Sequence, residues 1–236
     1  MVILHHPSGL RFCIANGCAV LDWSVRNDEL QRFVEIFSVH GNSEYFGHSQ
    51  NFMLMYHAGH FVQDALRMGH RLGIMYSSDS HNGHPGLSGL YDYHSYEPES
   101  GMVDKNSCRG CLVGVYSKEL TREAIWDALH NRRCYATTGK RIILDFRMDG
   151  HLMGEEYTAR SEREIFVKVI GTAPIAVIEI LQDNQVIFTR KGKKEIEEFT
   201  WYDRKPLNCK VSYYYYVRVT QKDGEMAWAS PIWVSR

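Results

Sequence analysis

The sequence predicts an α/β region followed by an all-β region, with the change near residue 140. Before that point, short apolar runs alternate with helical patterns, which is typical of a parallel sheet or a barrel. After it the helical patterns stop, and apolar residues recur at a period of two, which predicts strands. We therefore expect two domains, at residues 1–140 and 141–236.

The first region contains four apolar runs that read as strands, at residues 2–4, 34–37, 72–76 and 111–116. A helix is expected over residues 51–70, because apolar side chains recur there at helical spacing. A second helix is expected to begin at the N-cap Thr121 and to reach Arg133, with Leu120 and Ile125 forming a hydrophobic staple. Both helices are expected to cover a sheet.

The second region reads as seven strands joined by tight turns. Asp183-Asn184 and Asp223-Gly224 are turn sequences. One predicted strand, residues 211–220, carries tyrosines on both of its faces, so we expect it to lie inside a small antiparallel β-sandwich that is partly docked on the first region. The seven expected strands are residues 141–148, 164–170, 176–182, 185–190, 197–202, 211–220 and 228–234.

Charge and cysteine usage bear on partners and compartment. The chain has 27 basic and 28 acidic residues, so its charge favours neither nucleic acid nor an anionic membrane as a partner. No apolar run is long enough to span a bilayer, and the N-terminus lacks a signal-peptide pattern. The six cysteines show no disulfide spacing, so we expect a reducing, cytoplasmic compartment. The pair Cys108 and Cys111 is expected to be buried rather than to bind zinc or to act as a redox pair.

Side chains that bind metals follow several of the predicted strands. The segment Asp79-Ser80-His81 comes shortly after the third apolar run, where both side chains would lie on one side of an extended backbone. Active sites of parallel α/β folds are built at such strand ends. Histidine and carboxylate together, without cysteine, suit Zn, Mn or Fe. The candidate ligands are His5 or His6, Glu35, His40, Asp79 and His81.

Ordinary structural roles remain open for each residue alone. Glu35 would also fit a salt bridge at a strand end, and His40 would fit a turn. His5 and His6 are alternatives, because neighbouring side chains of an extended strand point in opposite directions. Asp79 would also fit a capping position in a loop.

Four motifs resemble the C-terminal part of the PHP (polymerase and histidinol phosphatase) superfamily, most closely an uncharacterised bacterial branch with a β-rich tail. They are His5-His6-Pro7, Val34-Glu35-Ile36-Phe37-Ser38 with His40-Gly41, Ser78-Asp79-Ser80-His81, and Tyr135-Ala136-Thr137-Thr138-Gly139. The resemblance implies a partial, distorted (β/α) barrel over residues 1–140, followed by the β-sandwich.

The resemblance also implies chemistry. A complete site of this family holds two or three divalent metal ions, which activate water to attack a phosphoester. The implied ligands are His6, Glu35, His40, Asp79 and His81, with His5 as the alternative to His6. Arg133 would add a forked donor for phosphate, although a charge at a helix end fits it equally. The expected substrate is a small phosphorylated molecule.

One departure limits the expected activity. The chain has no His-x-His motif, which opens the family's site, and it supplies only about half of a barrel. We therefore expect an incomplete metal site, in a fragment, a natural truncation or a chain that a partner or oligomer completes. The alternatives are a non-catalytic binding protein that uses the aromatic strand of the sandwich, and a structural module with incidental histidines.

Overall fold

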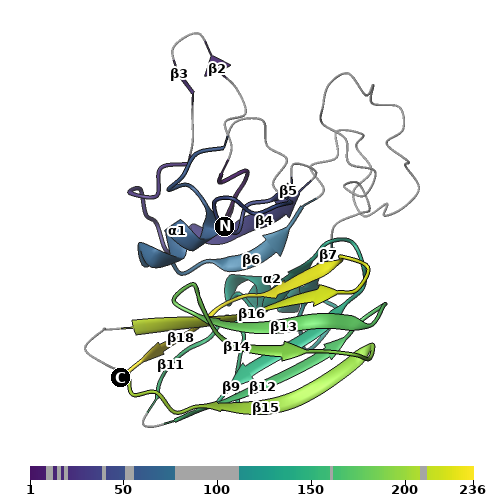
Figure 1. The fold of residues 1–236 in the computed structure, drawn as a ribbon. Helices are drawn as coiled ribbons and strands as arrows, with labels where there is room; N and C mark the ends of the chain where they lie inside the picture. Colours follow the sequence, from purple (N-terminus) through teal and green to yellow (C-terminus); the bar gives the residue numbers. More distant parts are fainter. Residues whose placement is uncertain are drawn as a thin grey trace.

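The chain folds into three layers of β-strands (Figure 1). The computed structural model describes residues 1–8, 13–14, 17–18, 21–38, 41–50, 56–77, 112–159, 162–207 and 212–236. Within this part of the chain, no helix is long and apolar enough to cross a membrane.

The first layer is a small sheet with three parallel strands. Its central strand is β4 (Gln31–Ser38), with β1 (Val2–Leu4) and β6 (Gly73–Tyr76) parallel to it on its two sides. β5 (Gly41–Asn42) turns back antiparallel on the end of β4. The short helix α1 (Val62–Arg67) buries Val62, Ala65 and Leu66 in the same core.

The middle layer is a sheet of eight strands. Antiparallel pairs dominate it, and β11 pairs in parallel with β18. Its members are β7 (Leu112–Val115), β8 (Cys134–Thr137), β11 (Glu156–Thr158), β13 (Ile175–Gln182), β14 (Gln185–Lys191), β16 (Ser212–Gln221), β17 (Met226–Ala229) and β18 (Ile232–Ser235).

The third layer is an antiparallel sheet of four strands, in the order β10-β9-β12-β15. Helix α2 (Arg122–His130) connects β7 to β8, and β2 (Cys13–Ile14) pairs with β3 (Gly17–Cys18) as a separate hairpin. The strands of the third layer are β9 (Ile143–Met148), β10 (His151–Leu152), β12 (Arg163–Ile170) and β15 (Ile196–Asp203).

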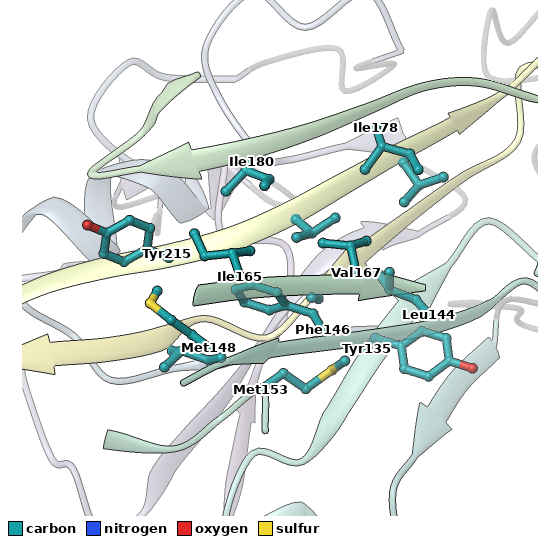
Figure 2. Packing of buried hydrophobic residues seen from close by; sticks show 14 of the residues in the cluster. Tyr135, Leu144, Phe146, Met148, Met153, Ile165, Val167, Ile178, Ile180 and Tyr215 are labelled. Carbon is teal, nitrogen blue, oxygen red and sulfur yellow. The ribbon is translucent and has the colours of Figure 1, made fainter. Parts of the chain in front are cut away.

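Strand β16 contributes side chains to two cores. Tyr215, Val217 and Val219 pack against the third layer, in the core that Figure 2 shows. Tyr214 and Tyr216 face the opposite way and pack against the first layer. Side chains alternate between the faces of a strand, so both sides of β16 are buried. The expectation that this strand carries aromatic bulk on both faces is confirmed.

The buried carboxylate of Glu44 joins the first layer to the middle one. Tyr216 Oη donates to Glu44 Oε1 at 2.7 Å, and Trp228 Nε1 donates to Oε2 at 2.9 Å. Arg218 Nη1 lies 2.9 Å from Oε1, and its Nε lies 2.8 Å from Glu179 Oε2. Glu44 follows β5, whereas the three donors come from β16 and β17. Three donors therefore offset the cost of burying this charge.

The expected (β/α) half-barrel is wrong. Among the described strands before residue 140, β1, β4 and β6 pair in parallel, whereas β7 and β8 pair antiparallel with each other and β8 pairs antiparallel with β17 in the middle sheet. The reason is that a short apolar run indicates a buried strand without indicating the direction of its partner. The middle sheet therefore draws strands from both sides of residue 140, and the two-domain division stays a prediction.

The two expected helices differ in outcome. The helix expected over residues 51–70 is confined to α1 within the described residues; Gly59, just before it, has a left-handed φ of +89° that a helix does not allow. The N-cap at Thr121 is confirmed, because its Oγ1 accepts from Ala124 N at 3.2 Å. The staple is wrong, because Leu120 is 94% exposed.

The seven strands expected after residue 140 are confirmed in position as β9, β12, β13, β14, β15, β16 and the β17–β18 pair. The last range divides in two at Ser230-Pro231, because proline has no N–H for the ladder. The turn at Asp183-Asn184 is also confirmed, with φ of +49° and +68° between β13 and β14.

Replacing Glu44 with alanine tests the junction between the layers. We expect Glu44→Ala to lower the free energy of unfolding by about 3 kcal/mol, because Arg218 keeps only Glu179 and two buried donors lose their acceptor. Urea denaturation measures the change. Glu198→Ala, which removes an exposed partner of Lys168, is the control and should leave stability nearly unchanged. Equal effects of the two substitutions would contradict the role of Glu44.

Candidate metal site

Three parallel strands bring their carboxyl ends together at one edge of the first layer. His5 and His6 follow β1, Glu35 lies within the central strand β4, and Ser77 follows β6. Side chains from distant parts of the sequence meet at such an edge because parallel strands end on the same side. The cluster in the structure consists of His5, His6 and Glu35.

Each imidazole lies beside a different oxygen of the Glu35 carboxylate. His5 Nδ1 is 2.8 Å from Oε2, and His6 Nδ1 is 3.4 Å from Oε1. The two rings are 3.5 Å apart between centroids. One ligand-type atom from each of the three residues lies within 4.8 Å of the other two, a spacing that allows all three to reach one ion.

The backbone at His6 explains why both histidines face Glu35. His6 has a φ of +50°, in the left-handed region, which costs a residue with a Cβ about 1–2 kcal/mol. An extended backbone would point the two rings in opposite directions, and the sequence therefore offered them as alternatives. The left-handed turn brings both to the same carboxylate, so they act as a pair. Such strain is typical of functional sites.

Further contacts hold the segment that follows His6. The Ser8 and Ser43 hydroxyls are 2.8 Å apart in the interior, and His57 N donates to Ser8 O at 3.1 Å. Ser43 precedes Glu44, so the same short segment contacts both Ser8 and the middle sheet. The buried contact between Ser8 and Ser43 therefore fixes the chain two residues after His6.

The Glu35 side chain is 3% exposed, yet it carries a negative charge. Burial alone would raise the pKa of its carboxyl group, but hydrogen bonds from His5 and His6, the charge of His5 and a further hydrogen bond from the Ser77 hydroxyl lower this pKa to about 2. An ionised carboxylate between two imidazoles is the state that a divalent cation requires.

The other predicted site residues have mixed outcomes. His40, Asp79 and His81 lie outside the described residues. Arg133 donates from Nη2 to Asp127 Oδ2 at 2.5 Å, at the end of α2, and its role toward phosphate stays a prediction.

Ser77 is the contact that the sequence did not reveal. Its hydroxyl donates to Glu35 Oε2. The signal in the sequence was a polar residue directly after the apolar run of β6. It predicts a contact with Glu35 only if β6 is known to lie beside β4.

The fold and the cluster define a layered β protein with a mixed imidazole and carboxylate site at the edge of a parallel sheet. Residues 58–165 match a family model described as "Protein of unknown function (DUF3604)". The expectation of a PHP relationship is therefore corrected, since DUF3604 is the family whose model matches.

Two uncharacterised chlamydial proteins are similar to half of the chain. One, from Chlamydia trachomatis, is 36% identical over 138 residues, and one from Chlamydia pneumoniae is 37% identical over the same length. The aligned region covers 52% of this chain and 22% of each relative, so the chain spans under a quarter of their length. An engineered protein of known structure matches at 12% identity over 41% of this chain and 20% of its own, with a TM-score of 0.27, which carries no structural argument.

The low pKa of Glu35 predicts a pH dependence of stability in the metal-free protein. Folding lowers this pKa from 4.5 to about 2, so the stabilisation is present above the unfolded value and is lost as the pH falls from about 4.5 to about 2. We expect Glu35→Gln to lose less stability than the unchanged protein over this range, by up to about 3 kcal/mol. Urea denaturation at a series of pH values measures the difference, and parallel curves would contradict the assignment.

Proposed function

We propose that this chain carries part of the site of a metal-dependent hydrolase with phosphoesterase-like chemistry. The observation that supports the proposal is the convergence of His5, His6 and Glu35 within 4.8 Å at the carboxyl edge of the parallel sheet. The two histidines that follow β1 meet a carboxylate of β4 there, and the backbone at His6 adopts a strained, left-handed conformation.

The donor set fits a borderline divalent cation. Two imidazoles and one carboxylate suit Zn, Mn or Fe, and three protein ligands leave coordination positions open for water and substrate. His6 and Glu35 are buried, and His5, whose side chain is 43% exposed, lies on the solvent side. The buried pair would anchor the ion, and the exposed side would admit a substrate.

Further ligands are proposed from the sequence. Asp79 and His81 come two and four residues after Ser77, whose hydroxyl contacts Glu35. His40 comes two residues after the end of β4. These residues extend the proposal toward a site with more than one ion.

A bound divalent cation would lower the pKa of a coordinated water and supply hydroxide near neutral pH. Neighbouring residues of the chain hold the proposed ligands in position. Glu35 stays ionised and accepts from Ser77, which limits its rotation, and the Ser8 to Ser43 contact holds the His6 segment in place. A small phosphorylated substrate is the proposed partner, because phosphoryl oxygens are suitable ligands for the open positions.

A binding protein stays the alternative function, but the aromatic strand, one of the two sequence features that favour it, is mostly buried in the structure. Tyr214, Tyr215 and Tyr216 are 5%, 0% and 2% exposed and belong to the two cores. Their rings are therefore engaged in packing and do not form a recognition surface. Metal-dependent chemistry is the function that we propose.

Metal binding is the first test. We expect the purified chain, freed of metal by chelation, to bind Zn²⁺ or Mn²⁺ stoichiometrically in isothermal titration calorimetry. His6→Ala should weaken binding by about a hundredfold, because a ligand counts at least as much as the groups that orient it. His151→Ala, in a half-exposed pair with Glu155, is the matched control. Tight binding that survives His6→Ala would contradict the site.

The double substitution of Asp79 and His81 by alanine examines the ligands proposed from the sequence. We expect it to reduce the metal content of the purified chain, measured by plasma mass spectrometry. Unchanged content with weakened binding by His6→Ala would confine the site to the three clustered residues.

Hydrolysis is the second test, and it uses both this chain and a full-length relative of the chlamydial type. We expect release of phosphate from a panel of phosphomonoesters and diesters in Mn²⁺ or Zn²⁺ buffer, and loss of this activity when this chain carries His6→Ala. Metal binding without hydrolysis in the full-length protein would refute the hydrolase and leave a structural metal.

A further inference from the structure

A second group of charged residues lies at the opposite end of the parallel sheet. Arg71 comes two residues before β6, and Arg32 lies at the start of β4, whereas the metal cluster gathers where strands end. This arginine cluster consists of Arg26, Arg32, Arg71 and Arg132. It is separate from the site described above.

Two of these arginines share one aromatic ring and one carboxylate. The guanidinium carbons of Arg71 and Arg132 lie 5.3 and 4.9 Å from the ring centroid of Trp233. Arg132 Nη2 donates to Glu156 Oε1 at 2.7 Å, and Arg71 Nε lies 3.8 Å from Glu156 Oε2. One carboxylate, on a side chain that is 47% exposed, therefore serves two guanidinium groups.

Each of the two arginines uses Nε and Nη2 in its contacts within the described part of the chain, which leaves Nη1 for a ligand. Arg132 Nε donates to Gly154 O at 3.1 Å, and Arg71 Nη2 donates to Ser212 Oγ at 3.0 Å. Within the part of the chain that the structure describes, no acceptor is recorded for Nη1 of either residue. The packing of both groups on Trp233 holds their planes without using these donors.

The cluster carries more positive than negative charge. Four arginines are accompanied by Asp28, which pairs with Arg26, and by Glu156. The excess is four minus two, or two positive charges. Burial and then the neighbouring Arg32 lower the pKa of Arg132 to about 10, and burial chiefly lowers the pKa of Arg71. A bound anion would reduce the repulsion between these positive charges.

We propose that Arg71 and Arg132 form a binding site for a phosphate-type dianion, in which the ligand competes with the Glu156 carboxylate. Guanidinium forks match the geometry of phosphate oxygens, and a dianion matches the charge excess. Glu156 occupies the site in the free protein and moves toward solvent when the ligand binds. Arg26 and Arg32 add to the positive field without contacting the ligand.

Inorganic phosphate is the probe, and calorimetry in EDTA at constant ionic strength removes any contribution from the metal site. We expect Arg71→Gln to weaken phosphate binding by about tenfold, because a charged hydrogen bond is lost. We expect Glu156→Gln to strengthen it by about fivefold, because a competing negative charge is removed while the side chain keeps its size.

The matched control is Glu198→Gln, which removes the same charge from an exposed pair with Lys168. It should bind phosphate as the unchanged protein does. Equal gains from Glu156→Gln and Glu198→Gln would show a general charge effect and overturn the site. Arg71→Gln that binds as well as the unchanged protein would overturn it, as would the absence of binding in both the unchanged protein and Glu156→Gln. Arg132 is left intact because it is buried.

Discussion

The fold depends on one buried carboxylate, that of Glu44. It accepts hydrogen bonds from Tyr216 and Trp228 and pairs with Arg218, so a residue from the loop after β5 is tied to the two strands β16 and β17. A charge at this depth is tolerated only when its partners are all in place. The small parallel sheet must therefore dock on the middle sheet so that all three partners reach Glu44. Aromatic side chains of both layers pack together in the core between the two sheets.

The same contact determines where the candidate metal site lies. Ser43, next to Glu44, meets Ser8, and Ser8 is two residues from the strained His6. Strain of this kind persists when the surrounding structure holds it from several sides. The cluster of His5, His6 and Glu35 thus rests on the docking of the two layers. The junction between the two layers is therefore connected to the candidate metal site through Glu44, Ser43, Ser8 and His6.

Much of the β structure could be predicted from the sequence, because the period-two pattern of β16 and the Asp183-Asn184 turn are local signals. Sheet connectivity could not be predicted, since the apolar runs of β7 and β8 do not show which strands they join. At the site, the ligand types near strand ends were recognisable from the sequence, and the structure brings Glu35 beside His5 and His6. The pairing of His5 with His6 was missed, because the left-handed turn at His6 depends on tertiary contacts. Ser77 was missed for the same reason.

The most direct measurement of the central claim, that His5, His6 and Glu35 hold a metal ion, is anomalous diffraction from crystals of the chain grown with Zn²⁺ or Mn²⁺. Data collected at the absorption edge should show a peak about 2.0–2.2 Å from ligand atoms of His6 and Glu35, with the hydrogen bond between His5 and Glu35 replaced by coordination. A metal peak elsewhere, with His5 Nδ1 still 2.8 Å from Glu35 Oε2, would contradict the claim.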